Sequence, residues 1–445
     1  MTPSPQCRVG CCSGACRSSS GFCSPSSSGR DCGAAATARG DRGEGKDRRQ
    51  GAAGQNPCCH ECEVNHLEKV EGVSHSRWLV AGKCASPIVE DGSLNKPRIR
   101  LCAVAKDEGP YLAEWVFHHL HVGFDEIHVL LNRTSDASAA VLARIGQAYP
   151  QVTFEFIDWV DLCDPSVGRK LQTIAYAKAL VDARAAGVDW LMFLDIDEFW
   201  TAQDLATRVD QLIARLCGDT PRPISFLWHC ELGQAQAFCA LQNGAGYELS
   251  SHLKTLFPIQ GIEIQHVRVH HPIFGRDVVP LDADGHPMVY SDTQPELADN
   301  SAIVPRQAYV IHRMYRSEEE YLALLLRGRP SGKQQLKTNR PGYRSHRNVK
   351  VGRRMVWPGE VFAAYDRAKR DFMQRLEISA LIERDREAIR QRAARAVAML
   401  LALVEEGDPD GATRFLRGTR HEAALAARLA AHGGADALGR TAASG

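Results

Sequence analysis

Three carboxylates follow directly on a run of apolar residues in the middle of the chain. Asp195, Asp197 and Glu198 come after the run from Trp190 to Leu194. A continuous apolar run is typical of a strand covered on both faces, and open α/β sheets bind their ligands at the carboxyl ends of such strands. Two aspartates two positions apart can share one hard cation, Mg²⁺ or Mn²⁺, and a bound diphosphate can complete its coordination shell. The spacing therefore suits a metal-bound diphosphate, with a solvated acidic turn as the simpler alternative.

The surrounding pattern predicts the elements that would position these carboxylates. Apolar strands expected at 99–105, 126–131, 152–159 and 190–194 alternate with helical patterns at 110–123, 138–148 and 168–186. Such alternation implies right-handed crossovers and a mostly parallel α/β sheet with helices on its faces. The acidic run would then lie at the carboxyl end of the fourth strand.

The rest of the chain suggests a division into four segments. Further strands are expected at 224–229 and 262–269, and residues 360–405 are rich in Ala, Arg, Glu and Leu with helical spacing. We therefore expect a disordered segment over 1–97, a catalytic domain over 98–330, a basic loop over 331–357 and an α-helical C-terminal appendage over 358–445.

The N-terminal segment contains ten of the fifteen cysteines. Cys58, Cys59, His60 and Cys62 could bind a zinc ion, but the segment does not contain two regularly spaced ligand pairs. With few large apolar residues before position 64, it cannot bury enough surface to offset the entropy of ordering, so we expect disorder.

The net charge and the hydropathy of the chain argue against some classes of protein. The formal net charge of +1 on 445 residues argues against a nucleic-acid-binding protein. We find no run of about 18 apolar residues and no apolar core of a secretory signal. The expected location is the cytoplasm, including the cytoplasmic face of the membrane.

Residues 327–354 form a basic segment, with ten Lys or Arg residues and no Asp or Glu. It could close over a diphosphate, or it could contact anionic lipid or an acidic polysaccharide. A solvated basic loop is the alternative.

Several ordered motifs resemble those of glycosyltransferase family 2-like and family 92-like enzymes with a GT-A fold. Lys106-Asp107-Glu108 is followed by Tyr111-Leu112-Ala113-Glu114-Trp115, which is similar to the Lys-Asn-Glu loop and Tyr-Leu-x-Glu-Trp helix of those proteins. Asp195-Ile196-Asp197-Glu198-Phe199 is similar to their Asp-x-Asp-Glu-Phe element at every position. The resemblance covers about residues 98–330. Leu131, Leu232 and Arg313 depart from the pattern.

The resemblance implies functions for particular side chains. Asp195 and Asp197 would hold a divalent cation, Mn²⁺ or Mg²⁺, together with the sugar nucleotide. Nucleotide-binding roles follow for Lys106, Glu108, Asp136, Gln172 and Asp195, and catalytic roles for Asp197, Glu198, His271 and His312. An inverting enzyme would also need a general base, for which Glu231 and Asp277 are both open candidates.

The function expected from this resemblance is metal-dependent transfer of a sugar from a nucleotide-sugar donor. The acceptor would be a carbohydrate, such as a cell-surface polysaccharide or glycoconjugate. One alternative is a nucleotidyl- or phospho-transferring enzyme on a similar fold, although a phosphate-cradling Gly-rich loop is missing. The other is a non-catalytic protein that binds nucleotide sugars, which the departures at Leu131, Leu232 and Arg313 would suit.

Overall fold

The computed structural model describes residues 96–294, 296–327, 337 and 340–431. The candidate zinc ligands of the N-terminal segment lie outside these residues, as do parts of the basic segment.

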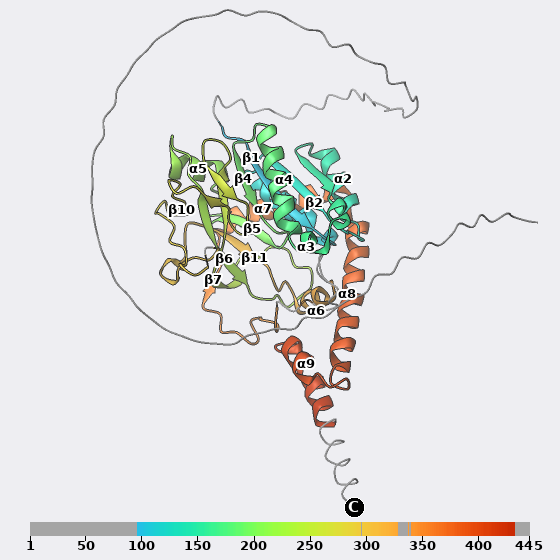
Figure 1. Cartoon of the computed structure of the whole chain (residues 1–445). Helices are drawn as coiled ribbons and strands as arrows, with labels where there is room; N and C mark the ends of the chain where they lie inside the picture. Colours follow the sequence, from blue (N-terminus) through green and yellow to red (C-terminus); the bar gives the residue numbers. More distant parts are fainter. Residues whose placement is uncertain (1–95, 295, 328–336, 338–339, 432–445) are drawn as a thin grey trace, which may run out of the picture. The chain divides into compact units, whose positions relative to one another are not determined.

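The first half of the fold is a parallel sheet with the strand order β3-β2-β1-β4. Each strand is followed by a helix or a turn, and parallel neighbours are therefore joined by crossovers (Figure 1). The order along the chain is β1 (Ile99–Ala105), α1 (Gly109–His121), β2 (Glu126–Leu131), α2 (Ser138–Ala148), β3 (Val152–Phe156), η1 (Asp158–Leu162), α3 (Pro165–Gly168), α4 (Leu171–Ala185) and β4 (Trp190–Phe193).

Side-chain alternation along β1 explains the layers on either side of this sheet. Leu101 and Ala103 pack into one apolar cluster with residues of α1 and α2, whereas Cys102 packs into a second cluster with residues of α4. Successive residues of a strand point to opposite faces, and an apolar run is therefore buried only when both faces are covered. Helices thus lie on both faces of the sheet.

The second half of the sheet is mixed. It continues from β4 in the order β7-β6-β11-β5, with β10 beside β6 and β12 beside β7. Of the strand pairings within this large sheet, over the described residues, five are parallel and four are antiparallel. The elements are β5 (Glu198–Ala202), α5 (Val209–Cys217), β6 (Ile224–Glu231), β7 (Gly246–Pro258), β8 (Ile264–His266), β9 (Ile273–Phe274), β10 (Leu281–Asp282), η2 (Asn300–Ala302), β11 (Ala308–His312), α6 (Glu318–Leu326) and β12 (Arg353–Arg354). The expected class is confirmed, because the sheet is mostly parallel and helices cover both faces.

Two strands are shorter than the sequence predicts. The third ends at Phe156, where a 3₁₀ helix begins at Asp158, and the strand expected over 262–269 is reduced to β8. β8 pairs only with β9 in a separate two-stranded sheet, so neighbouring strands do not extend it.

The C-terminal region is helical, as expected, but it is part of the main core. Its helices are α7 (Gly359–Leu376), α8 (Ser379–Ala402) and α9 (Pro409–Leu416). Tyr365 and Phe372 of α7 are buried in the same cluster as α1, and Asp385 of α8 accepts a hydrogen bond from the backbone N–H of Ala137 at 2.9 Å. α7 and α8 therefore pack against the main core.

None of the helices in the described part of the chain is long and apolar enough to cross a membrane.

Candidate active site

A cavity of about 560 Å³ lies where the sheet strands β1, β4, β6 and β11 end. Asp195 and Asp197 line it from the turn after β4, and His312 lines it from the last position of β11. Six of the side chains predicted from the sequence therefore line this one cavity, namely Lys106, Glu108, Gln172, Asp195, Asp197 and His312.

The acidic turn is held in place by α1 and by the chain just after β11. The indole N–H of Trp115 donates to the backbone oxygens of Asp195 and Glu198, at 3.1 and 2.9 Å. The backbone N–H of Arg313 donates to the backbone oxygen of Asp197 at 2.8 Å. These hydrogen bonds hold the main chain of the turn in place, so the side chains of Asp195 and Asp197 can face the cavity.

Asp197 lies among groups that favour its charged form. Its Oδ2 is 3.1 Å from Nη2 of Arg340 and 3.6 Å from Nε2 of His312. Burial opposes ionisation, but His312, Arg340 and Arg316 together hold the pKa of Asp197 well below its usual range. Asp197 is therefore a carboxylate at neutral pH.

Asp195 and Glu198 share a buried cation, Lys254. The ammonium is 3.5 Å from Oδ2 of Asp195 and 3.1 Å from Oε2 of Glu198, and the side chains of Lys254 and Glu198 are both 0% exposed. Burial would lower the pKa of Lys254, but the two carboxylates outweigh burial and raise it. Gln172 donates to Oδ1 of Asp195 at 2.7 Å. Glu198 is not among the residues that line the cavity, so it contributes through Asp195 and Lys254.

Basic side chains form another wall of the cavity. Glu108 is ion-paired with Arg316, at 3.2 Å, and with Arg327. Lys337 lies on the same wall, and burial, together with the nearby Arg340 and Arg327, lowers its pKa to about 7. Five basic side chains line the cavity (Lys106, Arg169, Arg327, Lys337 and Arg340) against three carboxylates (Glu108, Asp195 and Asp197). The excess of cationic groups favours an anionic ligand.

The facing pair Asp197 and His312 fits a divalent cation. A carboxylate oxygen and an imidazole nitrogen 3.6 Å apart can both lie about 2.0–2.2 Å from one ion. Burial lowers the pKa of His312, and a neutral imidazole is the form that binds metal. Nδ1 of His312 is buried without a hydrogen-bond partner in the described part of the chain. An ion here would have to displace Arg340 from Asp197.

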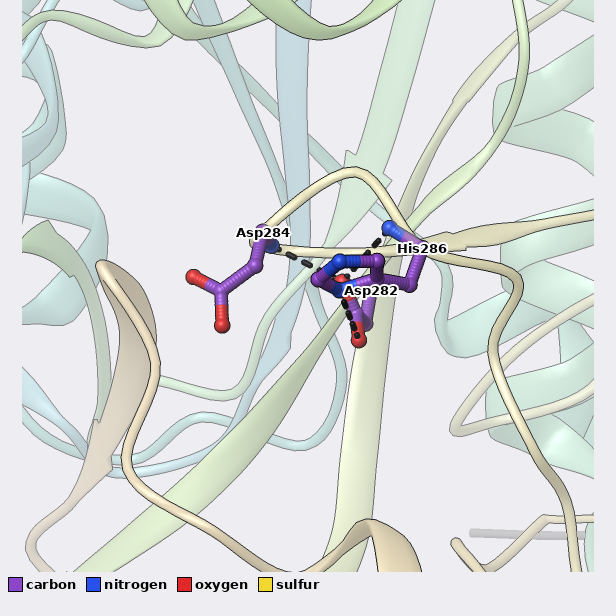
Figure 2. Close-up of side chains that lie close together, drawn as sticks. All are labelled: Asp282, Asp284 and His286. Atoms are coloured by element: carbon purple, nitrogen blue, oxygen red, sulfur yellow. Dashed lines mark hydrogen bonds and ion pairs between the residues drawn. The ribbon is translucent and has the colours of Figure 1, made fainter.

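A second acidic group lies elsewhere, on β10 and the turn that follows it. Asp282, Asp284 and His286 are the one group of three or more His, Cys, Asp and Glu residues, within the described ranges, whose ligand atoms all lie within 4.8 Å of one another. Figure 2 shows the backbone N–H groups of Asp284 and His286 donating to Asp282. Arg306 also pairs with Asp282 at 3.0 Å and with Asp284 at 2.9 Å. Because Arg306 already neutralises much of this charge, a structural turn explains the group.

Besides Glu198, two of the predicted site residues, Asp136 and His271, do not line the cavity. Asp136 accepts hydrogen bonds from the backbone N–H groups of Gly109 and Ser138, at 2.8 and 2.9 Å, so it joins the starts of α1 and α2. Its nucleotide-binding role stays a prediction. His271 is buried and stacks on Tyr290 with ring centroids 4.8 Å apart, and its neighbour His270 lines the cavity instead.

The candidates for a general base lie outside the cavity. Glu231 is buried and ion-paired with Arg313 at 2.6 Å, and Asp277 is exposed in a loop. Arg313 also pairs with Glu114 at 3.5 Å. Arg313, which departs from the family pattern, therefore belongs to a buried ion-pair network beneath the acidic turn.

Three further residues with ring side chains line the cavity, and the sequence did not assign them to it. Trp228, His252 and His270 line it together, and the rings of Trp228 and His252 are stacked at 4.8 Å with an interplanar angle of 10°. No single sequence motif could have identified these three residues, because they come from different elements. Only the fold brings them together.

Comparison with known proteins gives one sequence match. A glycosyltransferase family 92 protein from Ricinus communis is 25% identical over 100 residues, which is 22% of this chain and 16% of that protein. The resemblance to family 92 is confirmed. No protein-family profile matches the chain. The chain spans about a sixth of the length of this curated relative.

Among solved structures, a mannosyltransferase from Pyrobaculum calidifontis, in complex with GDP-mannose and Mn²⁺, matches with 14% identity and a TM-score of 0.26. The match covers 76% of this chain and 87% of that one. A TM-score this low carries no argument about function.

Proposed function

We propose that the protein is a metal-dependent glycosyltransferase that uses a nucleotide-sugar donor. The observation that carries this proposal is the convergence of Asp195, Asp197 and His312 on one cavity that is also lined by several basic side chains. Such a cavity suits a ligand that brings its own negative charge together with a metal ion. A nucleoside diphosphate linked to a sugar is a ligand of that kind.

Each wall of the cavity would have its own task. Asp197 and His312 would hold the cation, which supplies charge neutralisation at the leaving diphosphate. Arg327, Lys337 and Arg340 would contact the diphosphate oxygens, because a buried cationic group without a full set of carboxylates favours an anion. Gln172 and Lys254 would keep the Asp195 carboxylate oriented and charged.

The reaction makes one bond and breaks one. The acceptor oxygen bonds to the anomeric carbon, and the bond from that carbon to the diphosphate oxygen breaks with its electron pair going to the diphosphate. The acceptor hydroxyl loses its proton to a base. His252 and His270 line the cavity as neutral imidazoles that can accept this proton, but burial lowers the pKa of both, of His270 to about 3, which makes them weak bases.

Substitution of Asp197 tests the metal site. We expect Asp197→Asn to reduce Mn²⁺-dependent donor turnover by at least 100-fold, because the amide lacks the charge that binds the ion. The assay would measure release of UDP or GDP from UDP- and GDP-sugars, with and without EDTA. The matched control is Asp284→Asn, which changes an aspartate of the β10 turn outside the cavity.

The two variants distinguish the two acidic groups. Full turnover in Asp197→Asn together with loss in Asp284→Asn would move the metal site to the β10 turn. Full turnover in both, or turnover that EDTA does not reduce, would reject a metal-dependent reaction at this cavity.

A further inference from the structure

A second groove, of about 320 Å³, adjoins the cavity of the candidate active site. His252 and His270 line both spaces, so the two meet at these imidazoles. Arg268, which follows β8, forms a further part of the groove wall. The rest of the wall comes from the chain before η2, namely Thr293, Gln294, Glu296 and Leu297.

The outer wall of the groove is attached to the sheet by backbone contacts. The N–H of Ala298 donates to the carbonyl oxygen of Ser251 at 2.7 Å, and Leu297 forms a bridge with His252 of β7. The N–H of Ser291 donates to the carbonyl oxygen of Leu297 at 2.9 Å. The wall is therefore fixed beside the histidine that the two spaces share.

The two spaces differ in charge. The larger cavity has five basic side chains against three carboxylates, whereas the groove has one of each, Arg268 and Glu296, which lie 4.0 Å apart. The two shared histidines have lowered pKa values because they are buried, and they are therefore neutral at pH 7. The groove has no net charge to attract a polyanion or a lipid phosphate.

The polar groups of the groove suit hydroxyl-rich ligands. Thr293 and Gln294 are exposed and can both donate and accept hydrogen bonds, as sugar hydroxyls do. At the junction, the indole N–H of Trp228 and Nδ1 of His270 are buried without hydrogen-bond partners among the described residues. The rings of Trp228 and His252, stacked on each other, add apolar ring atoms beside these groups.

We propose that this groove binds the acceptor as a neutral saccharide and brings one of its hydroxyl groups to the donor cavity between His252 and His270. The inference rests on the proposed function for its reaction, but the binding of a saccharide to the groove can be measured separately. An acidic polysaccharide is not the acceptor that this groove fits.

The test fills the groove without changing the donor cavity. Gln294→Trp places a bulky ring on an exposed residue of the groove, and Thr293→Trp is a second variant should the first fail to fold. The matched control is Val289→Trp, since Val289 is 51% exposed and lines neither space. The probes are 4-nitrophenyl glycosides of glucose, galactose and mannose, with 4-nitrophenyl glucuronide as the anionic probe.

Binding would be measured by saturation-transfer NMR, and donor hydrolysis would be measured without any probe. We expect at least one neutral glycoside to bind wild-type protein and Val289→Trp, and to bind Gln294→Trp at least ten-fold more weakly. Donor hydrolysis should stay within two-fold in all three proteins.

The outcomes separate the two proposals. Equal binding of the glycoside to Gln294→Trp, binding of none of the neutral probes, or tighter binding of the glucuronide would overturn the groove assignment. Groove-dependent glycoside binding without any donor turnover would support the groove as a saccharide site and reject the transferase instead.

Discussion

At the scale of single residues, His118 illustrates how a buried polar side chain ties the sheet to the C-terminal helices. Nε2 donates to the backbone oxygen of Trp200 in β5 at 2.7 Å, and Nδ1 is 3.1 Å from the hydroxyl of Tyr365 in α7. A neutral imidazole satisfies both contacts with one donor and one acceptor. Burial lowers the pKa of His118 to about 3.

We expect this histidine to make stability depend on pH. Its folded pKa of about 3 lies below its unfolded value of about 6.5, so the unfolded state binds the extra proton between these limits and stability falls as pH decreases below 6.5. His118→Gln should reduce the loss of unfolding free energy between pH 7 and pH 5.5 by about 1 kcal/mol. Urea titrations at the two pH values would measure this.

The control for this prediction is His286→Gln, because the side chain of His286 is 71% exposed. Its free energy of unfolding should change with pH as the wild-type value does. A pH dependence of His118→Gln equal to that of the wild type would show that the imidazole is not the group that titrates.

At the scale of elements, the turn between β4 and β5 contacts Arg340 of the basic segment. Arg340 donates to Oδ2 of Asp197 at 3.1 Å and to the backbone oxygen of Met314. A metal ion at Asp197 would compete with this guanidinium, whereas a bound diphosphate would attract it. Arg340 should therefore weaken metal binding alone and strengthen donor binding.

We expect Arg340→Ala to separate these two effects. Calorimetry should show tighter binding of Mn²⁺ in the absence of donor, because the competing cation is gone. The apparent KM for the donor should increase at least ten-fold, because one partner of the diphosphate is lost. The control is Arg344→Ala, since Arg344 pairs with Glu248 at 2.7 Å with both side chains well exposed. Unchanged Mn²⁺ affinity and KM in Arg340→Ala would contradict the assignment.

The same elements show what could be predicted from sequence. The apolar run before Asp195 required a strand buried on both faces, and the position of Asp195 at the carboxyl end of that strand followed from the alternation of strands and helices. The pairing of Asp197 with Arg340 joins positions 143 residues apart, and no local pattern encodes such a distance. The family resemblance implies a catalytic role for His271, but neighbouring residues point in different directions, and only the folded chain shows that His270 is the one of the two that lines the cavity.

At the scale of the whole molecule, the core is not complete without the C-terminal helices. Tyr365, Phe372 and Leu376 of α7 and Ile382 of α8 are each at most 4% exposed and belong to the cluster that contains α1 and the sheet. Burying each such side chain contributes roughly 1.5–3 kcal/mol. Their sum is comparable with the whole stability of a typical domain, about 5–15 kcal/mol.

We therefore expect removal of residues 358–445 to abolish cooperative unfolding. The truncated chain would expose the apolar face of α1 and lose the partner of His118, so calorimetry should show no sharp transition and the product should bind a hydrophobic dye. The matched deletion removes residues 1–90, which the composition predicts to be disordered, and should leave the melting temperature nearly unchanged. A cooperative transition at the wild-type temperature in the first deletion would show that residues 98–357 form a complete domain. A large loss in the second would mean that the cysteine-rich segment contributes to folding, which its composition does not predict.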